Sequence, residues 1–165
     1  MIEKFNILFV CTGNTCRSPL AKGILEKMLK EKGVDSIETE SAGSGTFEGS
    51  PAPAYAVETA LARDIDLSFH CSRKLNKEML RKADLILVMS DEHLQQIELI
   101  DEESFEKAYL LRSFPKRIED KNLSITDPIG KSLDDYNLCF IEVEKEIKRI
   151  FPKLIKLADK KIRSC

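Results

Sequence analysis

The chain has 165 residues, a formal net charge of −2, and hydrophobic and charged residues that make up 42% and 33% of its length. This composition is that of an ordinary globular protein, and the length fits one domain spanning residues 1–165. The small net charge, with Lys and Arg spread along the chain, gives no reason to expect a nucleic-acid partner. No apolar stretch approaches the ~20 residues of a transmembrane helix, and the residues before the first apolar run do not form a signal peptide, so we expect no membrane partner.

Five cysteines, an odd number, are spread along the chain. Their spacing matches neither a zinc site nor the disulfide framework of a small secreted domain. Reduced thiols in the cytoplasm fit this pattern best, and we expect no metal and no other cofactor. The cysteines are Cys11, Cys16, Cys71, Cys139 and Cys165.

The first part of the chain alternates apolar runs with helical patterns. Residues 4–10 predict a strand buried on both faces, as in a parallel sheet. Pro19 suits the first position of the helix that follows, and Gly33 suits its stop. A second strand is expected over residues 37–41, and residues 44–53 are rich in Gly, Ser and Pro and predict a loop.

The middle of the chain continues this alternation. Helices are predicted over residues 54–63 and over residues 77–83, where Asn76 can cap the second helix. Residues 85–89 form another apolar run and predict a buried strand, and a polar helix is expected to begin near Ser90.

The last part of the chain completes the pattern. Residues 108–111 predict a weaker strand, and Ser132 can cap a long amphipathic final helix, which we expect Pro152 to kink or restart. Strands that alternate with helices along the whole chain predict an α/β fold, a three-layer sandwich whose parallel sheet has right-handed crossovers.

Between the first strand and its helix lies a loop that begins with a thiol and ends near an arginine. Its backbone N–H groups can surround an oxyanion, and the start of the helix adds partial positive charge. Arg17 offers a planar fork to two phosphate oxygens, and these positive surroundings favour the thiolate form of Cys11. We therefore predict Cys11 as a nucleophile, although without its neighbours it would be interpreted as a small buried residue. The residues expected to bind phosphate are Thr12, Gly13, Asn14, Thr15, Cys16, Arg17 and Ser18.

The run from Cys11 to Ser18 resembles the signature of the low-molecular-weight protein tyrosine phosphatase family, which also contains bacterial protein-arginine phosphatases. The resemblance implies a four-stranded parallel sheet in the order 2-1-3-4, with the phosphate loop after strand 1 at the carboxyl edge of the sheet. It also implies an enzyme that hydrolyses phosphorylated protein side chains through a phosphocysteine intermediate. The expected partner is then a phosphorylated protein, and inorganic phosphate is the product.

Departure of the leaving group needs a general acid near the loop, and Asp127, followed by Pro128, is the best candidate. It lies in a polar loop between the last strand and the final helix. Without the resemblance, an ordinary Asp-Pro turn would be the commoner explanation. The family places its acid in an Asp-Pro pair shortly before the final helix. The resemblance therefore implies a catalytic set of Cys11, Arg17 and Asp127.

Residues outside the loop are expected to support it. Asn14 and Ser18, together with Ser41 and His70, match family residues that form a hydrogen-bond network behind the phosphate. Asn tolerates the left-handed backbone conformation that such a network would hold. We expect His70 to orient the loop rather than to attack the phosphorus, and we expect His93, on a polar helix, to be solvated.

Cys16 has two competing interpretations. It is either a packing residue under the helix or the partner that traps oxidised Cys11 in a reversible disulfide. The family's tyrosine phosphatases use a cysteine at the matching position for redox protection. The sequence leaves both roles open.

The substrate preference follows from departures from the tyrosine phosphatase pattern. Those members commonly have Ile at the position of Thr15 and an aromatic pair after the Asp-Pro, where this chain has Ile129 and Gly130. Thr in the loop and Gly at this place are features of the protein-arginine phosphatases. A hydroxyl and a smaller wall suit a planar guanidinium, whereas an aromatic wall favours a phenyl ring. Phe47 and Tyr55 can still supply an aromatic side, so we favour phosphoarginine and keep phosphotyrosine as the alternative.

Two further interpretations are weaker. Thiol-linked arsenate reduction needs a closely spaced cysteine pair after the second strand, whereas Cys71 and Cys139 are far apart in the sequence. A phosphate-binding module without catalysis would not need both Cys11 and Asp127.

Overall fold

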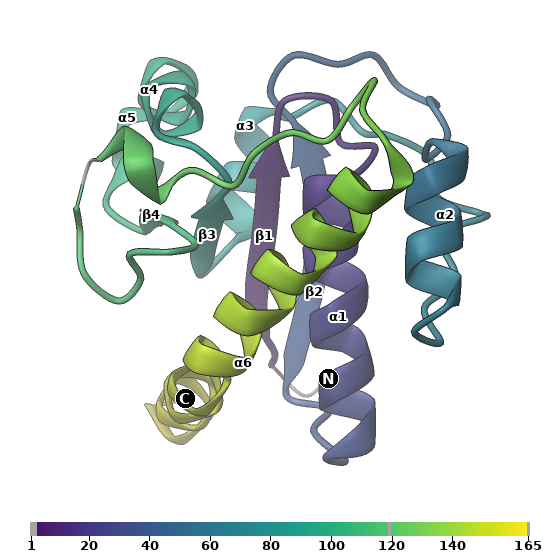
Figure 1. Cartoon of the computed structure of the whole chain (residues 1–165). Coiled ribbons are helices and arrows are strands. Elements are labelled where there is room, and N and C mark those ends of the chain that lie inside the picture. Colours follow the sequence, from purple (N-terminus) through teal and green to yellow (C-terminus); the bar gives the residue numbers. More distant parts are fainter. Residues whose placement is uncertain (1–2, 119, 165) are drawn as a thin grey trace.

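The computed structural model describes residues 3–118 and 120–164, so the expected reduced state of Cys165 concerns a residue outside this part of the chain. Each neighbouring pair of strands in its sheet is parallel. The strands are β1 (Phe5–Cys11), β2 (Ile37–Gly43), β3 (Leu85–Val88) and β4 (Ala108–Leu110). Their spatial order, β2-β1-β3-β4, is the order that was predicted, so that prediction is confirmed (Figure 1).

Helices cover both faces of this sheet and complete the three layers (Figure 1). Two further small elements lie in the connections. No helix among the described residues is both long and apolar enough to cross a bilayer. One face is covered by α1 (Arg17–Glu31), α2 (Ala54–Leu61) and α6 (Leu133–Ser164), and the other by α3 (Lys77–Lys82) and α4 (Asp91–Ile100). The small elements are α5 (Glu102–Phe105) and the 3-10 helix η1 (Lys121–Leu123).

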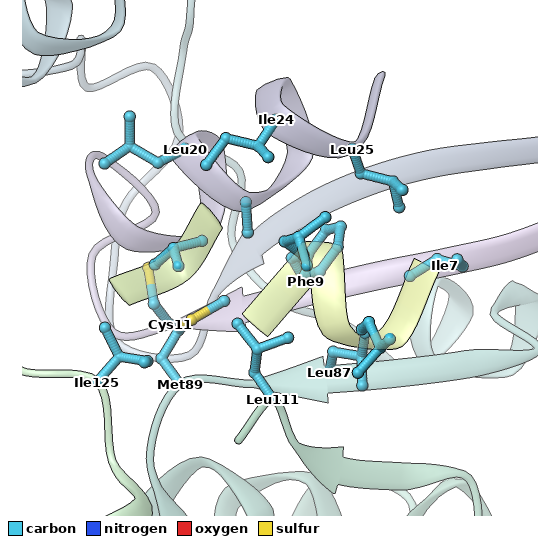
Figure 2. Close-up of a cluster of buried hydrophobic side chains, with 14 of the residues drawn as sticks. Ile7, Phe9, Cys11, Leu20, Ile24, Leu25, Leu87, Met89, Leu111 and Ile125 are labelled. Atoms are coloured by element: carbon cyan, nitrogen blue, oxygen red, sulfur yellow. The ribbon is translucent and has the colours of Figure 1, made fainter. Parts of the chain in front are cut away.

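β1 is buried on both faces, and its alternating side chains enter two separate cores. Ile7, Phe9 and Cys11 pack on the side of α1 and α6, while Leu8 and Val10 pack on the side of α3 and α4. Figure 2 shows the first core, where side chains of α1 meet those of the sheet and Cys11 ends the strand. Core packing thus fixes the last residue of the central strand at the edge where open α/β sheets bind ligands.

The predicted elements are present, with boundaries that differ by one or two residues. β1 extends to Cys11 and β2 to Gly43, since their pairing continues to the carboxyl edge of the sheet. α1 begins at Arg17, so Pro19 lies within its first turn rather than at its first position. Gly33 follows the end of α1 with a φ of 64°, a backbone conformation that glycine adopts readily.

Both predicted helix caps are present. Asn76 Oδ1 accepts a hydrogen bond from Met79 N at 2.9 Å, and Ser132 Oγ accepts from Asp135 N at 3.3 Å. Of the two predicted effects of Pro152, a restart is not observed, because α6 runs unbroken past it, and a kink is (Figure 1). Figure 1 shows that the last turns of α6 change direction, as expected where a proline removes one helical hydrogen bond. Buried side chains on both sides of the proline keep the two parts of the helix on the core.

Gly23 lies inside α1 and allows this helix to approach Ile65. A Cβ built on Gly23 would lie 2.7 Å from Ile65 Cγ2, which is a steric overlap. We expect Gly23→Ala to lower the free energy of unfolding by about 1–3 kcal/mol, although Ala is the better helix former. Urea denaturation measures this change. The cost should largely vanish in the background of Ile65→Ala, and a Gly23→Ala variant as stable as the parent would contradict the overlap.

Candidate active site

The carboxyl end of β1 leads into the predicted phosphate loop, residues 11–18, which folds back toward the sulfur of Cys11. Cys11 Sγ lies 2.9 Å from Ser18 Oγ, and the backbone N–H of Asn14 donates to Sγ over 3.2 Å. Asn14 Nδ2 donates to Ser18 Oγ at 2.8 Å, which leaves the serine proton free to point at the sulfur. Two donors therefore face Cys11 Sγ, an arrangement that stabilises negative charge on it.

Asn14 adopts the left-handed conformation, with a φ of 51°. Its buried side-chain amide uses both of its donors, because Nδ2 contacts Ser41 Oγ at 3.0 Å as well as Ser18 Oγ. Its Oδ1 accepts from the backbone N–H of Arg73 at 2.8 Å. These contacts tie the loop to β2 and to the segment before α3.

His70 holds the same asparagine from its backbone side. His70 Nε2 lies 2.6 Å from Asn14 O, and because a carbonyl oxygen only accepts, the imidazole carries its proton on Nε2. Burial lowers the pKa of His70, which favours the neutral ring. The structure therefore brings together all four residues of the predicted network, and His70 contacts the loop backbone rather than the sulfur. The four are Asn14, Ser18, Ser41 and His70.

Gly43, at the end of β2, lies so close to the loop that no side chain fits. A Cβ at this position would be 2.7 Å from Thr12 O and 2.6 Å from Thr46 Cγ2. The next residue, Ser44, donates its backbone N–H to Cys11 O at 2.9 Å. Sequence reasoning missed the role of this glycine, whose one local sign is its place just after the predicted second strand.

Arg17 joins the loop to the segment before α6. Its side chain is almost completely buried, with Nη1 donating to Ile125 O at 3.0 Å and Nη2 lying 3.2 Å from Asp127 Oδ2. Figure 1 shows this green segment crossing over the carboxyl end of β1. The Asp127 carboxylate is 40% exposed, and its Oδ1 accepts from Ile129 N at 3.1 Å. The predicted acid and the predicted phosphate-binding arginine thus lie side by side, with the acid open to solvent.

The residues predicted to set specificity border the loop to different degrees. A Cβ built on Gly13 would lie 3.6 Å from Thr15 Oγ1 and 3.9 Å from Ile129 Cδ1, so these two side chains lie near each other at the loop surface. Ile129 is half exposed, and the ring of Phe47 is 84% exposed. Tyr55 packs its ring edge-on against a tyrosine of α6, at a centroid distance of 5.8 Å. Thr15 and Ile129 are therefore the specificity candidates that the structure brings next to the loop.

Cys16 lies in the core rather than at the surface of the loop. A hydrogen bond with the thiol of Cys139, followed by burial, raises the pKa of Cys16 and keeps its thiol protonated. Both side chains belong to the core shared by α1 and α6, and all four cysteines in the described ranges are free. This environment supports a packing role for Cys16, and a disulfide with Cys11 stays a prediction.

The expectation of a solvated His93 is wrong, because its ring is completely buried. Ser90 N donates to His93 Nδ1 at 3.2 Å, and His93 Nε2 lies 2.9 Å from Thr12 Oγ1. Burial, followed by the positive charge of Arg17, lowers the pKa of His93 to about 4. The sequence signal is the pattern Ser-x-x-His at the start of the helix. The His side chain, at the third helical position, can reach back to the backbone of the capping Ser, as Glu or Gln does in a capping box.

This arrangement can bind a tetrahedral oxyanion and attack it. The loop amides, the N-terminus of α1 and the Arg17 guanidinium supply positive charge around one point. The sulfur of Cys11 faces two donors there, and the Asp127 carboxyl lies beside the guanidinium. In the described part of the chain, no three His, Cys, Asp or Glu side chains are grouped so that they could hold a metal ion.

Comparisons with known proteins agree with this chemistry. The family profile described as "Low molecular weight phosphotyrosine protein phosphatase" matches residues 6–162. A protein-arginine-phosphatase of Bacillus subtilis (strain 168) is 31% identical over 92% of this chain and 97% of that protein. The low molecular weight protein-tyrosine-phosphatase Etp of Escherichia coli (strain K12) is 38% identical over 86% of this chain and 90% of its own length. A solved structure of a YwlE arginine phosphatase mutant with a phosphorylated active-site serine superposes with a TM-score of 0.86, at 30% identity over 96% of this chain and 99% of that chain.

Asn14→Ala removes three hydrogen bonds and leaves a residue without a polar side chain in a left-handed conformation. We expect it to lower the free energy of unfolding by about 2–4 kcal/mol, because two buried hydroxyls and one partly buried backbone N–H lose their contact. The matched control is Asn14→Gly, which loses the same hydrogen bonds but adopts this backbone without strain, so it should be more stable than Asn14→Ala by ~1 kcal/mol. Chemical denaturation compares the two, and equal stabilities would argue against any contribution from backbone strain.

Proposed function

We propose that this chain, which belongs to the low molecular weight phosphotyrosine protein phosphatase family, hydrolyses phosphoarginine in proteins. The chain is a cysteine-dependent protein phosphatase, and its relatives include both protein-arginine and protein-tyrosine phosphatases. The observation that carries the choice of substrate is the hydroxyl of Thr15 at the loop surface beside Gly13, where an isoleucine would present only apolar atoms. Phosphotyrosine is the second candidate, because Etp shares the higher identity with this chain.

In the first chemical step, Cys11 attacks the phosphorus atom of the phosphoarginine. Its sulfur forms a bond to phosphorus while the bond from phosphorus to the arginine nitrogen breaks, and the electron pair of that bond passes to the nitrogen. The hydroxyl of Ser18 and the N–H of Asn14 lie on the sulfur and support its negative charge before the attack and after its release. The phosphorylated serine in the YwlE mutant supports a covalent intermediate at the matching place in that protein.

Arg17 and the loop amides bind the phosphoryl oxygens in this proposal. The guanidinium is held on one side by Ile125 O, so its fork is already oriented. Because the negative charge on the oxygens is spread over several donors, the transferring group is stabilised.

The basicity of the leaving group explains why a carboxyl group, Asp127, is needed beside the loop. A guanidine is a much stronger base than a phenolate, because the pKa of its conjugate acid lies well above that of phenol, so its departure depends more on a proton donor. Asp127 gives its proton to the departing nitrogen. In the second step, water attacks the phosphocysteine, Asp127 takes a proton from that water, and inorganic phosphate and the Cys11 thiolate are released.

We infer a cytoplasmic location and a phosphorylated protein as partner. Free thiols at the four described cysteines suit a reducing compartment. The proposal includes no nucleic-acid partner, since the net charge of the chain is −2.

The role of Asp127 predicts how a substitution affects different substrates. Asp127→Asn should slow hydrolysis of phosphoarginine by about 10²–10⁴-fold but should slow hydrolysis of an activated aryl phosphate far less, because a good leaving group needs little protonation. Steady-state kcat/KM values on both substrates measure the difference. Inhibition by inorganic phosphate controls for damage to the loop through the lost contact with Arg17, and equal losses on both substrates would argue that Asp127 is structural.

The role of Thr15 predicts a shift in substrate preference. Thr15→Ile replaces the hydroxyl with apolar bulk, so kcat/KM should fall more for a phosphoarginine protein than for a phosphotyrosine peptide, by about 10-fold in their ratio. Thr15→Ser keeps the hydroxyl and serves as the matched control, whose ratio should stay close to that of the parent. An unchanged ratio in Thr15→Ile, or a parent enzyme that strongly prefers phosphotyrosine, would favour the tyrosine phosphatase assignment.

A further inference from the structure

His93 is a buried side chain that the chemical steps above do not use, and it connects α4 to the phosphate loop. It lies in the first turn of α4, and its ring has no exposed surface. One ring nitrogen contacts the N-terminal cap of α4 at Ser90, and the other contacts Thr12, the residue that follows the nucleophile. The ring therefore spans the whole distance between the helix cap and the loop.

These two contacts fix the position of the imidazole proton. The backbone N–H of Ser90 can only donate, so His93 Nδ1 carries no hydrogen and the neutral ring carries it on Nε2. Nε2 consequently donates to Thr12 Oγ1 over 2.9 Å. Burial and the nearby charge of Arg17 lower the pKa of His93 to about 4, so the ring is neutral near pH 7.

Thr12 is also held on the side away from His93. Its carbonyl oxygen accepts from the N–H of Gly45 at 3.0 Å, and its Cγ2 would lie 3.3 Å from a Cβ built on Gly45. The side chain is thus fixed between α4 and the segment after β2. Because Thr12 directly follows Cys11, a rotation of this residue would move the first amides of the loop relative to the sulfur.

We propose that His93 is a positioning residue of this phosphatase, which fixes the first amides of the phosphate loop by donating from Nε2 to Thr12 Oγ1. A role in capping α4 needs only the acceptor at Nδ1, whereas the positioning role needs the donor at Nε2. The two roles are therefore separable. The proposal rests on the attack by Cys11 proposed above, but not on the choice between phosphoarginine and phosphotyrosine.

Two substitutions separate the two nitrogens. In His93→Asn, the side-chain oxygen lies near the former Nδ1 and keeps the cap, but nothing replaces the donor at Nε2. In His93→Gln, the amide nitrogen lies near the former Nε2 and keeps the donor, while the cap acceptor is lost. We expect His93→Asn to lower kcat by about 5- to 10-fold with little change in Tm, and His93→Gln to restore most of that loss with a lower Tm.

Thr12→Val tests the same hydrogen bond from the other partner. It removes the acceptor, keeps the shape of the side chain and leaves the cap of α4 intact, so it carries the test even where His93→Asn folds poorly. We expect a loss in kcat of about 5- to 10-fold and no further loss in the double variant Thr12→Val/His93→Asn, because both changes break one contact. The inhibition constant of inorganic phosphate should change less than kcat, since the effect falls on the transition state.

All variants are assayed on para-nitrophenyl phosphate, together with their thermal denaturation. Activities that follow Tm across the variants would overturn the positioning role, and so would additive losses in the double variant. A parent enzyme that hydrolyses the aryl phosphate but not phosphoarginine would overturn the proposed substrate while leaving the test of His93 valid.

Discussion

The left-handed backbone of Asn14 is the constraint on which the site depends. This turn directs the N–H of Asn14 at the sulfur of Cys11. Besides the local contact with Ser18, the stabilising partners are Ser41 in β2 and the segment that contains His70 and Arg73. The surroundings of the nucleophile are therefore a product of the tertiary fold, and they exist only once β2 and the segment before α3 are assembled around β1.

Other connections at the carboxyl edge of the sheet add further contacts to the loop. The segment before α6 reaches the loop through Arg17, and α4 reaches it through His93. Gly43 allows the end of β2 to approach within a distance that excludes any side chain. The charge and the donors of the site are thus fixed before a phosphoryl group arrives, which is the physical basis of electrostatic stabilisation in enzymes.

The sequence predicts the strands and the loop well because both depend on local patterns, whereas the order of the strands was implied by the resemblance to a known family. Apolar runs identify β1 and β3, and the spacing from Cys11 to Arg17 identifies the loop that follows β1. His93 was misjudged because the polarity of a helix does not reveal which of its side chains turns back toward another element. The sequence leaves open whether Pro152 kinks or restarts the last helix, and packing on both sides of the proline decides for one continuous, bent helix. The close approach at Gly43 depends on tertiary distances that no local pattern contains.

The contrast between Cys71 and the other described thiols has a practical consequence. Cys71 is exposed, whereas Cys11, Cys16 and Cys139 are buried. It directly follows His70, whose ring contacts the backbone of the left-handed asparagine. With inorganic phosphate bound over Cys11, a bulky maleimide dye would react at Cys71 and would then lie next to the residue that holds the loop. The chain thus carries a natural attachment point for an optical reporter next to its own site.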